Sequence, residues 1–200
     1  MGKVMIINAS PRAPKSNSKQ YAQLFSQYCR LDTEYYEVKR SNHLTLCRTI
    51  ENYSHIVFVF PLYVDSIPVP LLNFLKTLEE NAPLKKPTIS VIVNCGFIEP
   101  YQNDVAVEML RSFTTKNGYP FGSVFKIGSG EAILTTPFRI FLKIKMKKFA
   151  ISVINQRYNN FQATMPISKK MFIKASTAYW ENYGKKNGIS KEEMEIMQIE

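Results

Sequence analysis

Short apolar runs alternate along this chain with longer segments whose apolar residues recur every three or four positions. The first pattern predicts strands and the second predicts helices that pack on one side. Four predicted strands are nearly continuous apolar runs, typical of a sheet buried on both faces, and one alternates. They are KVMII at 3–7, the alternating TEYYEVK at 33–39, HIVFVF at 55–60, TISVIVN at 88–94 and SVFKIG at 123–128.

The segments between and after these strands have helical spacing. The predicted helices cover residues 18–30, 44–52, 69–80, 101–117, 136–158 and 167–187, with a short charged tail. Residues expected to face the core are Leu71, Leu72, Leu75 and Leu78 in the third helix and Val105, Met109, Leu110 and Phe113 in the fourth. This alternation indicates an α/β protein with one doubly wound parallel sheet. We expect residues 1–130 to form its core and residues 131–200 to add helices that complete the same domain.

In such a sheet, ligands bind beyond the carboxyl ends of the strands, where the strand order reverses. The first loop there, NASPRAPKSNS at 8–18, is long and polar. Its hydroxyls, the Arg12 guanidinium and the N–H groups of a helix start are suited to a phosphate. The alternative is a surface loop that only caps a helix. Because the loop contains neither GxxxxGKS/T nor GxGxxG, a phosphate monoester fits better than a nucleoside triphosphate or a dinucleotide.

Two further loops at this edge have unusual compositions. PLYVDSIPVP, residues 61–70, holds Tyr63 among three prolines, and the restricted backbone suits main-chain contacts with a flat ring. NCGF, residues 94–97, ends the fourth apolar strand. Gly96 permits close approach of the backbone to a ligand, and Phe97 is able to cover a ring edge. The alternatives are a rigid connection in which Tyr63 is merely packed, and an ordinary turn.

Together the three loops resemble the flavodoxin-like family of NAD(P)H-dependent FMN reductases and quinone reductases, over about residues 1–130. Members commonly read Gly-Ser-Pro-Arg and then Gly/Ser-Asn-Thr/Ser in the first loop, and Pro-x-Tyr followed by a helix-opening Pro in the second. The matching residues are Ser10, Pro11, Arg12, Asn17 and Ser18 in the first loop and Pro61, Tyr63 and Pro68 in the second. Ala9 replaces the usual glycine, and the first loop is slightly longer than in the family.

The resemblance implies a five-stranded parallel sheet of order 2-1-3-4-5 and an FMN cofactor. It places the FMN phosphate on Ser10, Arg12, Ser16, Asn17 and Ser18. It places the isoalloxazine ring against Pro61, Leu62, Tyr63 and Val64 and against Asn94, Cys95, Gly96 and Phe97. Some members carry a four-cysteine iron–sulfur cluster before the third strand. Only Cys47 lies in that region here, so we expect no cluster and no metal.

The activity implied by the resemblance is electron transfer from NADPH or NADH to a quinone, a second flavin or another small acceptor. The flavin supplies this chemistry, so no side chain is assigned a catalytic role. A homodimer is also implied, because related enzymes complete the ring pocket with a second subunit. Two other functions stay open: a flavodoxin-like electron carrier without its own NAD(P)H reaction, and a non-catalytic binding protein. The net charge of +10 counts against the carrier, since flavodoxins tend to be acidic.

The positive charge is concentrated in the last third of the chain. No Asp or Glu lies between Ala132 and Trp180, whereas nine cations do. The predicted helix at 136–158 carries two apolar stripes, one with Phe138, Phe141, Leu142, Met146, Phe149 and Val153 and the other with Ile140, Ile144, Ile151 and Ile154. A helix packed on the sheet with its lysines in water is the simplest interpretation. The alternatives are peripheral contact with an anionic membrane through the basic region 138–174, or a dimer surface with a pocket for the NADPH 2′-phosphate. Nucleic acid is not expected, because no RNA- or DNA-binding motif is present.

The remaining reactive residues carry little signal. Cys29, Cys47 and Cys95 fit neither a disulfide framework nor a zinc site and favour a reducing cytoplasm. No apolar run is long enough to span a membrane, and the first residues do not form a secretory signal. His43 and His55 are isolated and receive no catalytic role. GSGEA at 128–132 lacks the third glycine of a dinucleotide motif and is interpreted as a turn.

Overall fold

The computed structural model describes residues 2–13 and 15–196. It divides into two compact units, Met1–Met165 and Pro166–Glu200. Residue 130, where we placed the end of the core, lies inside the first unit. The first unit includes residues 131–165, and the second begins at Pro166.

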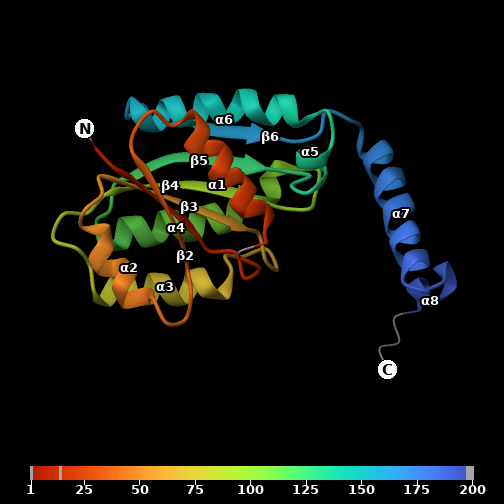
Figure 1. The fold of residues 1–200 in the computed structure, drawn as a ribbon, viewed down its shortest axis with the longest axis horizontal. Helices are drawn as coiled ribbons and strands as arrows, with labels where there is room; N and C mark the ends of the chain where they lie inside the picture. Colours follow the sequence, from red (N-terminus) through yellow and green to blue (C-terminus); the bar gives the residue numbers. More distant parts are fainter. Residues whose placement is uncertain (1, 14, 197–200) are drawn as a thin grey trace. The chain divides into compact units, whose positions relative to one another are not determined.

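The first unit is built on a parallel sheet, which has six strands within the described residues (Figure 1). Their bounds are β1 Val4–Asn8, β2 Thr33–Glu37, β3 His55–Pro61, β4 Thr88–Asn94, β5 Phe121–Ile127 and β6 Asn160–Ala163. The strand order is β2-β1-β3-β4-β5-β6. The α/β class and the order of the first five strands are confirmed, but the predicted number of five is wrong. Two of the four residues of β6, NFQA, are polar, and only Ala163 is buried, so hydrophobic periodicity did not reveal this edge strand.

Helices cover both faces of the sheet (Figure 1). In the first unit these are α1 Asn17–Tyr28, α2 His43–Ile50, α3 Val69–Glu80, the 3-10 turn η1 Pro100–Asn103, α4 Asp104–Asn117, α5 Ala132–Thr135 and α6 Arg139–Ile154. Helices α1 and α6 pack on one face, where the rings of Phe25 and Phe149 lie 5.6 Å apart. Helices α2, α3 and α4 pack on the other, against Phe58 and Phe60. The helix predicted at 136–158 is shorter and begins after Pro137, which has no N–H for an earlier helical turn.

Two residues expected in the core are exposed, Leu72 of α3 and Val105 of α4. In α4 the stripe that faces the sheet is rotated by one position and contains Ala106, Val107 and Leu110. Apolar residues border the buried stripe on both sides of these helices. The apolar spacing is therefore compatible with two rotations of each helix about its axis, and contact with the sheet determines which one forms.

The second unit contains α7 Lys169–Lys186 and α8 Lys191–Glu195. Ser190 and Glu193 form a reciprocal capping box that starts α8, where the sequence predicted only a charged tail. On α7 the rings of Tyr179, Trp180 and Tyr183 contact one another and are about half exposed. Among the described residues of either unit, no helix is both long and apolar enough to cross a membrane.

Candidate functional site

The loops that follow β1, β3 and β4 are joined by hydrogen bonds at the carboxyl edge of the sheet. The N–H of Ala9 donates to the carbonyl of Val59 at 3.0 Å, and the N–H of Leu62 donates to the carbonyl of Asn94 at 2.7 Å. The Asn94 amide donates to the Ser18 hydroxyl at 3.3 Å. Adjacent parallel strands bring these loops together, as the doubly wound arrangement predicts.

The loop after β1 folds back on itself. The Ser10 N–H donates to Asn8 Oδ1 at 2.9 Å, and the Arg12 N–H donates to Ser10 Oγ at 3.3 Å. A further turn bond joins the Ala13 N–H to the Ser10 carbonyl at 3.1 Å. Ser10 is buried, whereas Arg12 is exposed. In the part of the chain that the structure describes, the Arg12 guanidinium has no ion-pair partner, so its charge is available to an anion.

Helix α1 starts at the end of this loop with a side-chain cap. Ser16 has extended backbone angles, φ −134° and ψ 153°, and its Oγ accepts a hydrogen bond from the Lys19 N–H at 3.2 Å. The amide of Asn8 reaches the same oxygen at 3.3 Å. Ser16 is therefore an N-cap, with Asn17 in the first helical turn. Ser18 is almost fully buried and joins the helix to Asn94, which the sequence pattern did not indicate.

Two cations beside the helix start were missed by sequence reasoning. A hollow of about 340 Å³ is lined by Lys15, Ser16, Asn17, Lys19, Gln20 and Gln23. Lys19 Nζ lies 3.9 Å from Glu37 and 5.8 Å from the centre of the Tyr35 ring. Lysines attract phosphate as point charges, and a helix N-terminus adds partial positive charge. The sequence signal for these two cations was the position of Lys15 and Lys19 on either side of the N-cap Ser16. It is recognisable only once Ser16 is known to be the cap.

The loop after β3 contains a strained turn. The N–H and carbonyl groups of Tyr63 and Ser66 bond each other reciprocally at 3.0 and 2.9 Å. The two residues between them, Val64 and Asp65, have φ angles of 47° and 53°. Left-handed backbone is rare for a β-branched residue, so this turn holds local backbone strain at Val64. Tyr63 is 48 % exposed and Val64 is 93 % exposed, while Pro61 and Leu62 are half-buried. The turn therefore holds an apolar loop tip at the surface.

The loop after β4 combines buried and exposed residues. Asn94 is buried, and its amide also donates to the Phe60 carbonyl at 3.0 Å. The Cys95 thiol is buried against Asn103 at 3.3 Å, and burial raises its pKa. Gly96 is exposed, and Phe97 is 51 % exposed. Phe97 and Gly96 thus face outward, whereas Cys95 contributes its backbone and not a reactive thiol.

A fourth loop, Gly128 to Gly130 after β5, packs against the loop after β4. The Gly130 N–H donates to the Cys95 carbonyl at 2.8 Å, and the Ser129 N–H donates to the Phe97 carbonyl at 2.5 Å. The Tyr21 hydroxyl donates to the Gly130 carbonyl. A Cβ on Gly130 would lie 3.1 Å from Asn94 Oδ1, so a glycine permits this close approach. The sequence interpretation as a turn missed that this segment supports the site.

A cavity of about 430 Å³ lies beside the first loop, a volume within the range of small-molecule sites. Its lining residues are Ser10, Pro11, Ala13, Glu37, Val38, Lys39, Arg40, His43, Val69, Pro70 and Asn73. Burial lowers the pKa of His43, and Lys39 and Arg40 bring positive charge to the cavity. Sequence reasoning missed both residues, because a Lys-Arg pair after a strand is common on protein surfaces.

The chemistry of this edge fits a phosphorylated ring compound. The described residues contain no group of His, Cys, Asp and Glu that could hold a metal ion. The first loop offers Arg12 and Lys15, and Lys19 lies in the first turns of α1. The loops after β3 and β4 offer the exposed rings of Tyr63 and Phe97. The donor set therefore fits FMN, with cations at one end and apolar surface at the other. The structure does not test the individual contacts, so the residues assigned to FMN stay predictions.

Comparison with known proteins supports this fold. The chain matches no protein-family model and no curated protein sequence. A flavodoxin from Streptococcus pneumonia TIGR4 is similar in structure, with a TM-score of 0.58 at 14% identity over 77% of this chain and 99% of its own. An NAD(P)H:quinone oxidoreductase from Methanothermobacter marburgensis has a TM-score of 0.59 at 13% identity over 76% and 96%. An azoreductase from Bacillus anthracis has a TM-score of 0.52 at 16% identity over 78% and 100%. The chain therefore has the flavodoxin-like fold, as the resemblance of its three loops predicted.

Proposed function

We propose that this protein is an FMN-dependent oxidoreductase that passes electrons from NADPH or NADH to a small acceptor. The observation that carries the proposal is the junction of the loops after β1, β3 and β4, which are hydrogen-bonded together at the carboxyl edge of a flavodoxin-like sheet. Solved structures of similar fold include NAD(P)H quinone reductases and an FMN-dependent NADH-azoreductase. A quinone, a second flavin or another small molecule is the proposed acceptor.

In this proposal the first loop binds the FMN phosphate. Arg12 supplies a forked cationic donor, and Ser10, Ser16, Asn17 and Ser18 line the loop and the helix start. Because the Ser10, Ser16 and Ser18 oxygens already accept internal hydrogen bonds, their part is to shape the loop and orient its N–H groups. The charge that neutralises the phosphate then comes from Arg12, with Lys15 and Lys19 nearby.

The other loops would hold the ring. Pro61, Leu62, Tyr63 and Val64 lie on one side and Asn94, Cys95, Gly96 and Phe97 on the other. When bound, FMN supplies reversible hydride and electron transfer. The protein's own residues position the ring through the stiffened loop after β3 and shield it from water with Tyr63 and Phe97. No catalytic side chain is proposed.

We further propose a homodimer in a reducing cytoplasm. Tyr63 and Phe97 are each about half exposed, so a ring held between their loops has an open face, which a second subunit would complete. Cys29, Cys47 and Cys95 are all free thiols, which is consistent with a reducing compartment.

An electron carrier is the second candidate, favoured by the similarity to a flavodoxin. The first experiment is an absorption spectrum of the purified protein before and after FMN is added, with a dissociation constant. Flavin bands and tight binding are expected, and a colourless protein that ignores FMN would contradict the proposal. Steady-state oxidation of NADPH and NADH with a quinone then separates the two candidates, because only a reductase turns over.

A further inference from the structure

Helix α6 is the most basic helix of the first unit. Its 16 residues, RIFLKIKMKKFAISVI, include Arg139, Lys143, Lys145, Lys147 and Lys148 and no acidic residue. Neither the flavin-binding edge nor any ion pair given by the structure accounts for these cations. Their function is therefore independent of the proposed FMN site.

One face of α6 is fully used in the fold. Leu142, Met146, Phe149 and Val153 are buried, and Phe149 packs against the rings of Phe25 and Phe125 with centroids 5.6 and 5.8 Å away. Ser152 closes this face through a 2.7 Å hydrogen bond with Ser123 of β5. The inner face thus needs no further partner.

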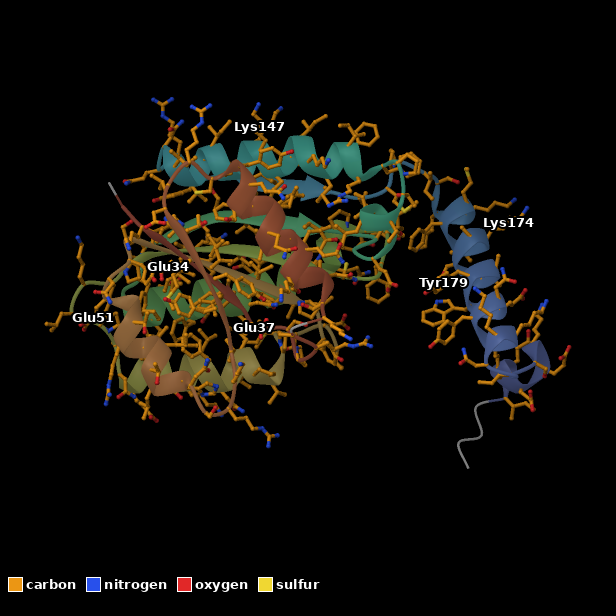
Figure 2. All side chains as sticks on the ribbon, in the orientation of Figure 1. Glu34, Glu37, Glu51, Lys147, Lys174 and Tyr179 are labelled. Carbon is orange, nitrogen blue, oxygen red and sulfur yellow. The ribbon has the colours of Figure 1, made fainter. Side chains whose placement is uncertain are left out.

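The opposite face of the same helix is also apolar. Ile140, Ile144 and Ile151 are 54 %, 48 % and 44 % exposed. Their spacing of four and seven places them in one line along the helix, opposite the buried residues. We call this line the outer ridge. Lys147 lies beside it on the side of α6 that faces away from the sheet (Figure 2), and Lys143 and Lys148 lie near the ridge by helical position.

We propose that the outer ridge of α6 docks on the surface of an anionic lipid bilayer. The exposed side of α6 carries apolar residues between lysines and no acidic residue, which are residue types that interfacial helices present to lipid. The lysines would contact lipid headgroups, while the isoleucines would enter the boundary of the acyl chains. The 16 residues extend over roughly 24 Å, which provides a linear contact along the membrane plane.

Charge argues for a bilayer over a second copy of this chain. A two-fold contact through the outer ridge would place Lys143, Lys147 and Lys148 of one α6 opposite the same lysines of its partner. Like charges brought together in this way oppose association, whereas anionic headgroups attract these lysines. The net charge of +10 for the whole chain adds to the attraction of an anionic surface.

The test is co-sedimentation of the full chain with vesicles. We expect binding to vesicles of equal parts phosphatidylglycerol and phosphatidylcholine, weakening as salt is added, and no binding to phosphatidylcholine alone. Lys147→Glu with Lys148→Glu should reduce the partition constant by about 30-fold or more, at roughly tenfold per 1.4 kcal/mol and about 1 kcal/mol per lost cation. The matched control is Lys76→Glu with Lys85→Glu, two exposed lysines outside α6, which should change it by less than about threefold.

A second variant examines the apolar part of the contact. Ile140→Ser with Ile144→Ser keeps every cation and should reduce the partition constant by about tenfold or more. Because both side chains are already about half exposed, the fold should be retained, which circular dichroism verifies. Failure to bind phosphatidylglycerol vesicles, or equal losses in the α6 and control charge variants, would overturn the proposal. So would an α6 variant that changes the sedimentation coefficient without vesicles, since the outer ridge would then contact protein. The α6 variants should leave the FMN spectrum unchanged whether or not the chain binds vesicles, so this test is separate from that of the proposed function.

Discussion

Two clusters of small polar side chains lie in the same domain, one in its interior and one at its edge. The interior cluster joins His55 of β3, Ser90 of β4, Ser123 of β5 and Ser152 of α6, all buried. His55 Nε2 lies 2.8 Å from Ser90 Oγ, which accepts the Ser123 N–H at 2.9 Å. The Ser123 and Ser152 hydroxyls lie 2.7 Å apart. Each side chain satisfies its neighbour, so this cluster holds strands and helix together.

The edge cluster contains Asn8, Ser10, Ser16, Ser18 and Asn94. Its members also bond one another, but they lie where β1 and β4 end and beside hollows that hold Lys15, Lys19, Lys39 and Arg40. Similar residue types therefore have different consequences at the two places. Buried polar groups inside the sheet bond one another and stabilise the fold. Those at the carboxyl edge lie beside hollows, cations and a helix N-terminus, where a ligand can bind.

The largest expected effect concerns pH and the interior cluster. Burial lowers the pKa of His55 from its ordinary value of 6.5 to about 4. Above pH 6.5 the imidazole is neutral in the folded and unfolded chain, so it adds no pH dependence. Between pH 6.5 and 4 only the unfolded chain takes up the proton, and the free energy of unfolding should fall by roughly 3 kcal/mol. Urea unfolding across this range measures the loss.

The control for this prediction is His55→Gln, which keeps a polar group for Ser90 but does not titrate. Its free energy of unfolding should depend less on pH over the same interval. An identical pH dependence in both proteins would show that His55 is not the group that titrates. FMN binding should be unchanged by this substitution, since the interior cluster lies away from the carboxyl edge.

Arg12→Ala is expected to have the largest effect at the edge. Loss of a charged hydrogen bond should weaken FMN binding by about 1.5–3 kcal/mol. Riboflavin has no phosphate, so its affinity should hardly change, and stability should change by less than about 0.5 kcal/mol because Arg12 is exposed. Fluorescence titration with both ligands checks the prediction. Equal losses for FMN and riboflavin would contradict the phosphate assignment.

Asn94→Ala should affect both stability and binding. It removes the donor to the Phe60 carbonyl and to the Ser18 hydroxyl, which separates the loops after β1 and β4. A cost of about 1–2 kcal/mol in the free energy of unfolding is expected, together with weaker FMN binding. The exposed Asn52 offers a matched control, because Asn52→Ala should leave both quantities unchanged. Loss of stability with unaltered FMN affinity would show that Asn94 only stabilises the fold, as the residues of the interior cluster do.

Val64→Gly is expected to have the smallest effect, with the opposite sign. The φ angle of 47° suits glycine better than a β-branched residue. Relief of this strain should raise the free energy of unfolding by about 0.5–1 kcal/mol, after the entropy cost of glycine. If the turn positions a ring, the freer loop should bind FMN more weakly. Greater stability with unchanged affinity would mean that the strain has no role in binding.

Hydrophobic patterning alone determined most of the fold. Four apolar strands, one alternating strand and the intervening helices predicted a doubly wound sheet. A parallel strand buried on both faces is apolar at nearly every position, so its sequence is easy to recognise. The loops after strands 1, 3 and 4 were also recognisable, since their composition departs from that of ordinary turns. These features are local, and each is expressed in consecutive residues.

Only the tertiary structure decided the features that depend on distant residues. The strand β6 is formed by pairing with β5, not by its own apolar content. Ser18 became a buried link because Asn94, far along the chain, reaches it, and Gly130 joined the site through the Cys95 carbonyl. On α6 the sequence showed two apolar stripes, and packing on the sheet determined which would be buried. A stripe records only which residues share a helix face, and the three-dimensional neighbours determine whether that face meets the core or the solvent.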